Sequence, residues 1–130
     1  RIPIAAVTPK GSRIEFRTPD STSNPYLAFA AMLLAGLDGI KKQLDARKLG
    51  FGPLDKNIYE LSEAEKREIR SVPASLDEAL DALEADHDFL LEGGVFSKDF
   101  INNFISIKRA EAKDVAIRVH PHEFSLYFDC

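Results

Sequence analysis

Charged and apolar side chains alternate in residues 13–17, which read Arg-Ile-Glu-Phe-Arg. We predict a β-strand here. Successive side chains of a strand point to opposite faces, so Arg13, Glu15 and Arg17 would stand in a row about 6–7 Å apart. Guanidinium groups can hold carboxylate or phosphate oxygens, and an ionised carboxylate can bind a hard metal ion. The row therefore fits a site for anions and a metal ion, and it also fits a solvated strand face with a weak ion pair.

Two further cations precede this row. Arg1 lies in an earlier predicted strand, and Lys10 lies in the turn that joins the two strands. If the strands pair, both side chains could add cationic contacts to the row. Together these cations and Glu15 would suit a nucleotide, a divalent metal ion and an acidic substrate.

The histidines suggest no second site. His120 and His122 lie two residues apart and adjoin Glu123, but no fourth metal ligand lies near them in the sequence. We interpret both as residues of a turn or a helix end. The acidic run around His87 is typical of a solvated helix surface, and no sequence neighbour would activate the thiol of Cys130 as a nucleophile.

Composition argues against several classes of protein. The 130 residues carry a net charge of −4 with a pI near 5.4, which argues against nucleic-acid binding through phosphate neutralisation. Lysine and arginine are scattered, and the longest apolar run, residues 26–35, is too short to span a bilayer, so we expect no membrane partner. The single cysteine allows no internal disulfide, which fits a reducing, cytoplasmic setting.

The predicted fold class is α+β, with two antiparallel N-terminal strands followed by a mainly helical layer and a C-terminal docking tail. The predicted segments are the strands within 1–18, a buried helix at 24–46, a loop with a short helix at 47–74, two helices at 75–117 and the tail at 118–130.

Capping residues mark where the helices begin. One is an asparagine followed by proline, the favoured order at a helix start. Two are serines followed three residues later by glutamate, the capping-box pattern. With a further serine before the last long helix, the predicted N-caps are Asn24, Ser62, Ser75 and Ser97. Gly93 and Gly94 are expected to end the helix that begins after Ser75.

Two segments carry more apolar surface than a chain of this size can bury. The first half of the helix at 24–46 is apolar all round, which predicts burial on every side and a larger surrounding body. The tail alternates Phe124, Leu126 and Phe128 with polar or amphipathic residues, and we expect it to dock on another surface.

Several motifs, in order, resemble the last part of the catalytic domain of bacterial type I glutamine synthetase. They are RIPIAAVTPKGSRIEFRTPDSTSNPYLAFAAMLLAGLDGIKK, DKNIYEL, SLDEALDALEADHDFLLEGGVF and HPHEFSLYFDC, and they span essentially the whole chain. The resemblance implies ATP-dependent condensation of L-glutamate with ammonia through γ-glutamyl phosphate, with Mg²⁺ or Mn²⁺. It also implies that the chain is a C-terminal fragment, inactive alone, because other parts of the site lie outside it.

The resemblance implies roles for individual residues. Arg1, Lys10 and Arg13 match positions that contact ATP, and Arg13, on the phosphate side, would be catalytic. Glu15 matches a metal ligand, and Arg17 matches the arginine that holds the substrate glutamate.

Regulation and assembly are implied as well. Tyr59 in NIYEL resembles the tyrosine that an adenylyltransferase modifies in the regulated branch of the family, whereas without the family it would be interpreted as a half-buried loop aromatic. The tail resembles the segment that enters a subunit of the opposite ring in a homododecamer.

Two alternatives stay open. The chain could be a standalone helical binding or assembly module that keeps the shape of the family's C-terminal part. It could also belong to a related ligase that joins glutamate to another amine, because the residues that choose the amine are not in this stretch.

Overall fold

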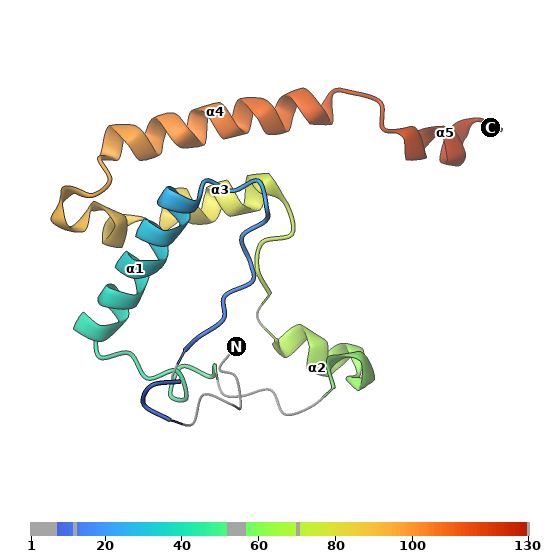
Figure 1. Ribbon diagram of the computed structural model, residues 1–130. Coiled ribbons are helices and arrows are strands. Elements are labelled where there is room, and N and C mark those ends of the chain that lie inside the picture. Colours follow the sequence, from blue (N-terminus) through green and yellow to red (C-terminus); the bar gives the residue numbers. More distant parts are fainter. Residues whose placement is uncertain (1–7, 12, 52–56, 70, 130) are drawn as a thin grey trace.

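The computed structural model describes residues 8–11, 13–51, 57–69 and 71–129 (Figure 1). In chain order its helices are α1 (Pro25–Lys41), the 3₁₀ helix η1 (Ile58–Glu60), α2 (Glu63–Glu68), α3 (Leu76–Ala85), the 3₁₀ helix η2 (Asp88–Gly94), α4 (Lys98–Ala116) and α5 (Pro121–Tyr127). α3 packs against α4, and α1 packs on η2. α5 projects beyond the end of α4, away from the other helices (Figure 1).

The predicted α+β class is wrong. Residues 13–18 form no strand, and the part of the chain that the structure describes contains only helices and irregular segments. A strand needs a neighbour that receives its backbone hydrogen bonds. Within the described ranges no segment pairs with residues 13–18, so the alternating sequence does not give a sheet. The other predicted strand, at residues 1–7, lies outside the described residues.

A small apolar core joins four of the helices. Ile101 and Ile105 of α4 are four residues apart, which places them on one helix face. Leu80 of α3 packs in the same cluster. The buried residues of this core are Leu34, Leu80, Leu90, Phe96, Ile101 and Ile105. Because they come from α1, α3, η2, α4 and the turn before α4, the core is what assembles these elements.

An ion-pair bridge joins α3 and α4 outside the core. Arg109 Nη2 donates hydrogen bonds to Asp81 Oδ1 at 2.6 Å and to Glu84 Oε2 at 2.8 Å. The bonds to these carboxylates, first that to Asp81, raise the pKa of Arg109 above its usual range. All three side chains are partly solvated, so the bridge fixes how the two helices face each other more than it adds to stability.

The predicted N-caps are confirmed. The side chains of Asn24, Ser62, Ser75 and Ser97 each accept a backbone N–H in the first turn of the following helix. Ser62 forms a full capping box with Glu65. The box predicted at Ser75 is incomplete, because the Glu78 carboxylate accepts the N–H of Ala74 instead of that of Ser75.

α3 ends at Ala85, well before the glycines at 93–94 that the sequence predicts as its end. His87 Nδ1 lies 3.0 Å from the carbonyl oxygen of Leu83 and 3.1 Å from that of Glu84. A carbonyl only accepts, so an N–H at Nδ1 satisfies carbonyl groups left open at the helix end. The two glycines, with φ of 67° and 69°, lie at the end of η2 instead.

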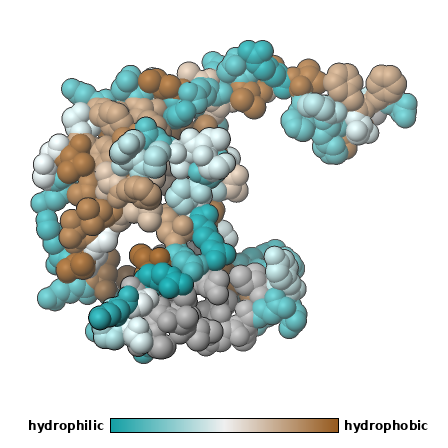
Figure 2. All heavy atoms as spheres, in the orientation of Figure 1, coloured by the Kyte–Doolittle hydropathy of each residue, from teal (hydrophilic) through white to brown (hydrophobic). Residues whose placement is uncertain are grey.

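Within the described part of the chain α1 is only partly covered, and its burial on every side by a larger surrounding body stays a prediction. Leu34 is buried, but Tyr26 is 83% exposed, and Phe29 and Leu33 are also exposed. Among the described elements its main neighbour is η2. Hydrophobic residues therefore gather on the surface over this helix (Figure 2).

A polar turn leads from the charged segment into α1. Asp20 Oδ1 accepts hydrogen bonds from the backbone N–H of Thr22 at 2.6 Å and from its hydroxyl at 2.7 Å. The hydroxyl bond, followed by the backbone bond, lowers the pKa of Asp20 below its ordinary 3.8. The turn is therefore stabilised by the ionised carboxylate and weakens as the pH falls through the lowered pKa.

We expect Ile101→Ala to lower the free energy of unfolding by about 2–5 kcal/mol, because it opens a cavity in the core. Urea unfolding followed by helical circular dichroism measures the change. Ile107→Ala is the matched control on the same helix: Ile107 is 49% exposed and Ile101 is 2% exposed, so the control should cost much less. Equal losses in the two variants would contradict this core.

We expect the Asp20 carboxyl to titrate below 3.8 because Thr22 donates to its charged form. Its side-chain carbonyl chemical shift, followed by NMR from pH 2 to pH 6, gives the midpoint. Thr22→Val removes the hydroxyl donor, and the midpoint should rise toward 3.8. Ser23→Ala should move it less, because the Ser23 hydroxyl donates to the backbone carbonyl of Asp20. A midpoint that Thr22→Val leaves unchanged would refute this cause.

Candidate functional site

The charged row contains one close ion pair. Residues 13–18 have no regular secondary structure, yet Arg17 Nη2 lies 2.6 Å from Glu15 Oε2. The side chain of Arg17 is 71% exposed and that of Glu15 is 28% exposed. The contact is the ion pair that a solvated face would show, and an exposed pair of this kind contributes at most about 1 kcal/mol. It can therefore open toward a ligand at little cost.

The remaining cations of the predicted site differ in position. Arg13 is exposed, and Lys10 is exposed in a turn that is closed by a hydrogen bond from Gly11 N to Thr8 O at 2.9 Å. Arg1 lies outside the described residues. Among the residues that the structure describes, no ion pair joins Lys10 or Arg13 to the pair of Glu15 and Arg17. Of the members of the predicted site that the structure describes, it brings Glu15 and Arg17 together.

The opposite side of the charged row is uncovered. Ile14 and Phe16, which alternate with the charges, are both exposed. A strand in a layered domain would bury these two side chains against a neighbouring element. The described residues thus provide the charged side of a site but not the apolar layer that would hold it in place.

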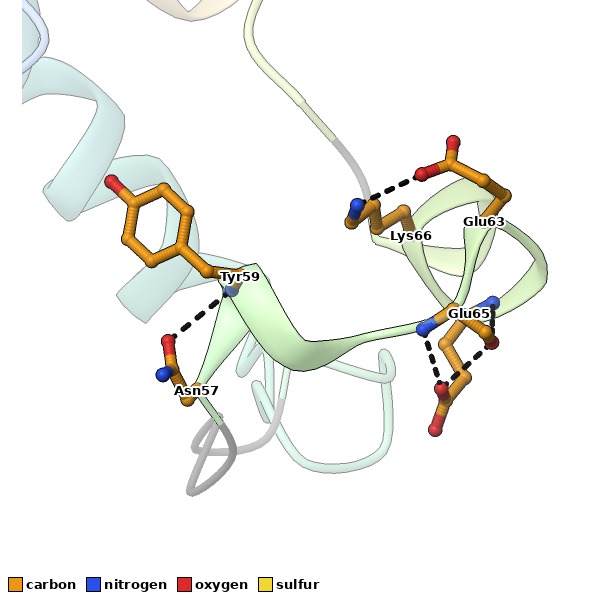
Figure 3. A network of polar contacts seen from close by, with 6 residues as sticks. Asn57, Tyr59, Glu63, Glu65 and Lys66 are labelled. Carbon is orange, nitrogen blue, oxygen red and sulfur yellow. Dashed lines mark hydrogen bonds and ion pairs between the residues drawn. The ribbon is translucent and has the colours of Figure 1, made fainter.

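Tyr59 stands at the surface on η1. Its backbone N–H donates to Asn57 Oδ1 at 3.2 Å, and Asn57 Nδ2 donates to Glu60 Oε1 at 2.8 Å. The ring points away from Asn57 and from the ion pair of Glu63 and Lys66 on α2 (Figure 3). With 93% of Tyr59 exposed, the alternative interpretation of a half-buried aromatic is wrong, and the phenol is open to solvent.

The histidines near the C-terminus cap a helix. His120 Nδ1 accepts the backbone N–H of His122 at 3.1 Å, and Glu123 Oε1 accepts the N–H of His120 at 2.9 Å. The predicted helix-end role is confirmed, and no group of three potential metal ligands occurs within the described ranges. The helix itself, α5, is a feature that the sequence reasoning missed. Pro121 at its first position, with glutamate two residues later, was the signal for it.

A membrane span is absent from the described part of the chain, where each helix is too short or too polar to cross a bilayer.

Comparison with known proteins gives a clear result. Residues 1–127 match the family model of the glutamine synthetase catalytic domain. The chain is 56% identical over 131 residues to a glutamine synthetase of Microchaete diplosiphon, which covers all of this chain and 27% of the relative. It is 56% identical to a glutamine synthetase of Nostoc sp. PCC 7120, with 99% of this chain and 27% of the relative covered.

A relative with lower identity gives the same result. Identity to a glutamine synthetase of Mycobacterium tuberculosis is 52% over 130 residues, which covers 99% of this chain and 26% of the relative. The chain therefore spans about a quarter of the length of these relatives and corresponds to their C-terminal part. On the family match and these identities, the chain belongs to the glutamine synthetase catalytic-domain family.

Proposed function

We propose that this chain supplies part of the active site of a glutamine synthetase, which ligates L-glutamate to ammonia at the expense of ATP. The observation that carries the proposal is the family match over residues 1–127, with 56% identity to proteins named glutamine synthetase. The charged row at residues 13–17 supports it, because cations and a carboxylate are the groups that phosphate, metal and substrate carboxylate require.

The reaction has two steps that the cations would assist. A γ-carboxylate oxygen of glutamate attacks the γ-phosphorus of ATP, and ADP leaves. Ammonia then attacks the carbonyl carbon of the γ-glutamyl phosphate, phosphate leaves, and a proton passes to solvent as glutamine forms. Both steps develop charge on phosphate oxygens, and fixed guanidinium groups stabilise such charge. We assign this catalytic role to Arg13, and we assign contacts with the rest of ATP to Arg1 and Lys10.

We assign binding of the substrate carboxylate to Arg17. Its guanidinium has five N–H donors, and the contact to Glu15 engages one nitrogen, so donors remain for a second carboxylate. Its exposure supports this role, because a ligand can reach the group without moving the backbone. Arg17 can thus hold Glu15 and substrate together, or it can exchange one for the other.

Glu15 fits a metal ligand. Mg²⁺ is usually bound by one or two carboxylates together with substrate phosphates and water, so one glutamate from this segment is enough if others complete the set. No cluster of three ligands occurs among the described residues, so the remaining ligands would come from ATP and from other parts of the synthetase. Mg²⁺ or Mn²⁺ held by Glu15 would supply positive charge that favours negative charge on the phosphate oxygens.

Assembly is part of the proposal. The apolar surface of α1 and the exposed aromatic residues of α5 would be covered by the rest of the catalytic domain and by neighbouring subunits of a homododecamer.

The exposed ring of Tyr59 supports its role as the target of an adenylyltransferase. We place the enzyme in the cytoplasm, where the single cysteine of this chain would stay reduced.

A second candidate function is a binding module that works by assembly alone. The observation that favours it is α5, where Phe124, Tyr127 and Phe128 are all exposed at the end of the molecule. Such a module would need its helices but not its charged row. Substitutions in residues 13–17 therefore separate the two candidates.

We expect Arg17→Ala, in a full-length synthetase that carries this sequence as its C-terminal part, to raise KM for glutamate about 10- to 100-fold, because charge-assisted hydrogen bonds to the substrate are lost. KM for ATP should change little. Steady-state phosphate release at varied glutamate measures both.

Arg118→Ala is the matched control for this variant. Arg118 is also 71% exposed and also pairs with a carboxylate, that of Asp114 at 2.9 Å, but it lies after α4. Its KM for glutamate should stay at the wild-type value. If Arg17→Ala leaves KM for glutamate unchanged, as Arg118→Ala should, the proposed site is wrong and the binding-module function is favoured. Phosphate release with a polyamine in place of ammonia tests the alternative that the enzyme joins glutamate to another amine.

We expect the 130-residue chain alone to form no glutamine from ATP, glutamate and ammonia with Mg²⁺, because its described residues present no complete set of metal ligands. Chromatographic detection of glutamine, with a full-length synthetase as positive control, provides the measurement. Glutamine formed by the chain alone would contradict the view that the site is shared with other parts of the enzyme.

A further inference from the structure

α5 has an unusual N-cap. The residues that most often cap helices are serine, threonine, aspartate and asparagine, whose oxygens accept a backbone N–H at any pH near neutrality. In α5 the acceptor is His120 Nδ1, which lies 3.1 Å from the backbone nitrogen of His122. The helix is only seven residues long, so its first turn depends on this bond more than a long helix would.

The bond is compatible with one charge state of His120. A backbone N–H can only donate, so Nδ1 must carry a free lone pair, and the ring must be neutral with its proton on Nε2. In the imidazolium both ring nitrogens carry protons, and Nδ1 can no longer accept. Histidine is the side chain whose charge ordinarily changes between pH 5 and pH 8. Protonation of His120 therefore removes the cap.

Neighbouring charges do not reverse this effect. On α5, Glu123 would attract the imidazolium, but its Oε1 already accepts the N–H of His120 and the side chain is exposed. His122 would repel it once protonated. On the α4 side, Arg118 pairs with Asp114. A positive charge at a helix N-terminus is itself unfavourable.

We propose that α5 is a pH-dependent helix that forms when His120 is neutral and unfolds when it is protonated. The consequence concerns Phe124, Tyr127 and Phe128, which line one shallow hollow together with Val119 and Glu123. Three- and four-residue spacings place these aromatic rings on one face only while the segment is helical. The helix thus controls whether the tail presents a continuous apolar face. The proposal does not depend on the function assigned above.

NMR of the full 130-residue chain tests this directly. Cα and carbonyl secondary shifts of residues 121–127 report helix content, and they are compared at pH 8.0 and pH 5.5, where glutamate stays ionised. Loss of one N-cap bond should lower the ratio of helical to non-helical α5 about fivefold. Secondary shifts in α4 serve as the internal reference and should not change.

Three variants test whether protonation of His120 causes the pH response of α5. His120→Asn keeps an acceptor that does not titrate, so α5 should stay helical at both pH values. His120→Ala should have low helix content at both. His122→Gln removes the other histidine of the turn but keeps its backbone N–H, so the pH response should persist. A pH response retained in His120→Asn, one abolished in His122→Gln, or an α5 without helical shifts at pH 8.0 would overturn the proposal.

Discussion

The packing of α4 against α3, in a core that also takes in Leu90 of η2, is the constraint on which the rest of the structure depends. In the described part of the chain, six buried side chains make up this core, among them Ile101, Ile105 and Leu80. Short helices are marginal in water by themselves and gain most of their stability from packing an apolar face. α1 joins the same core mainly through Leu34, and it keeps most of its apolar surface open.

This arrangement separates the helical part from the charged segment. The core lies in the part of the chain after residue 25, and the pair of Glu15 and Arg17 lies before it, joined to α1 by the turn at Asp20. An active site needs its groups held by packing and by second contacts. Because Ile14 and Phe16 are uncovered, the proposed site would take those contacts from outside the described residues.

Local features were predictable from the sequence, and features set by distant contacts were not. The caps at Asn24 and Ser97 depend on neighbours within one turn, and they were found correctly. The strand at 13–18 depends on partners far away in the sequence, and that prediction was wrong. The full burial of α1 depends on a larger surrounding body and stays a prediction. The end of α3 was missed because His87 bonds its final carbonyl groups, which no pattern of apolar residues reveals. The roles of the charged residues came from family resemblance and remain predictions.

The bridge from Arg109 to α3 has a mechanical consequence. α4 has 19 residues, so it is about 28 Å long, with its buried residues in the first half and the tail attached to the other end. Ala116, the last residue of α4, lies about 16 Å beyond Ile105, so a rotation of α4 by ten degrees about the core would displace this end by about 3 Å. Arg109 lies between those two ends and is bonded to two carboxylates on α3. These bonds therefore restrict rotation of α4 relative to α3, and the position of the tail depends on them.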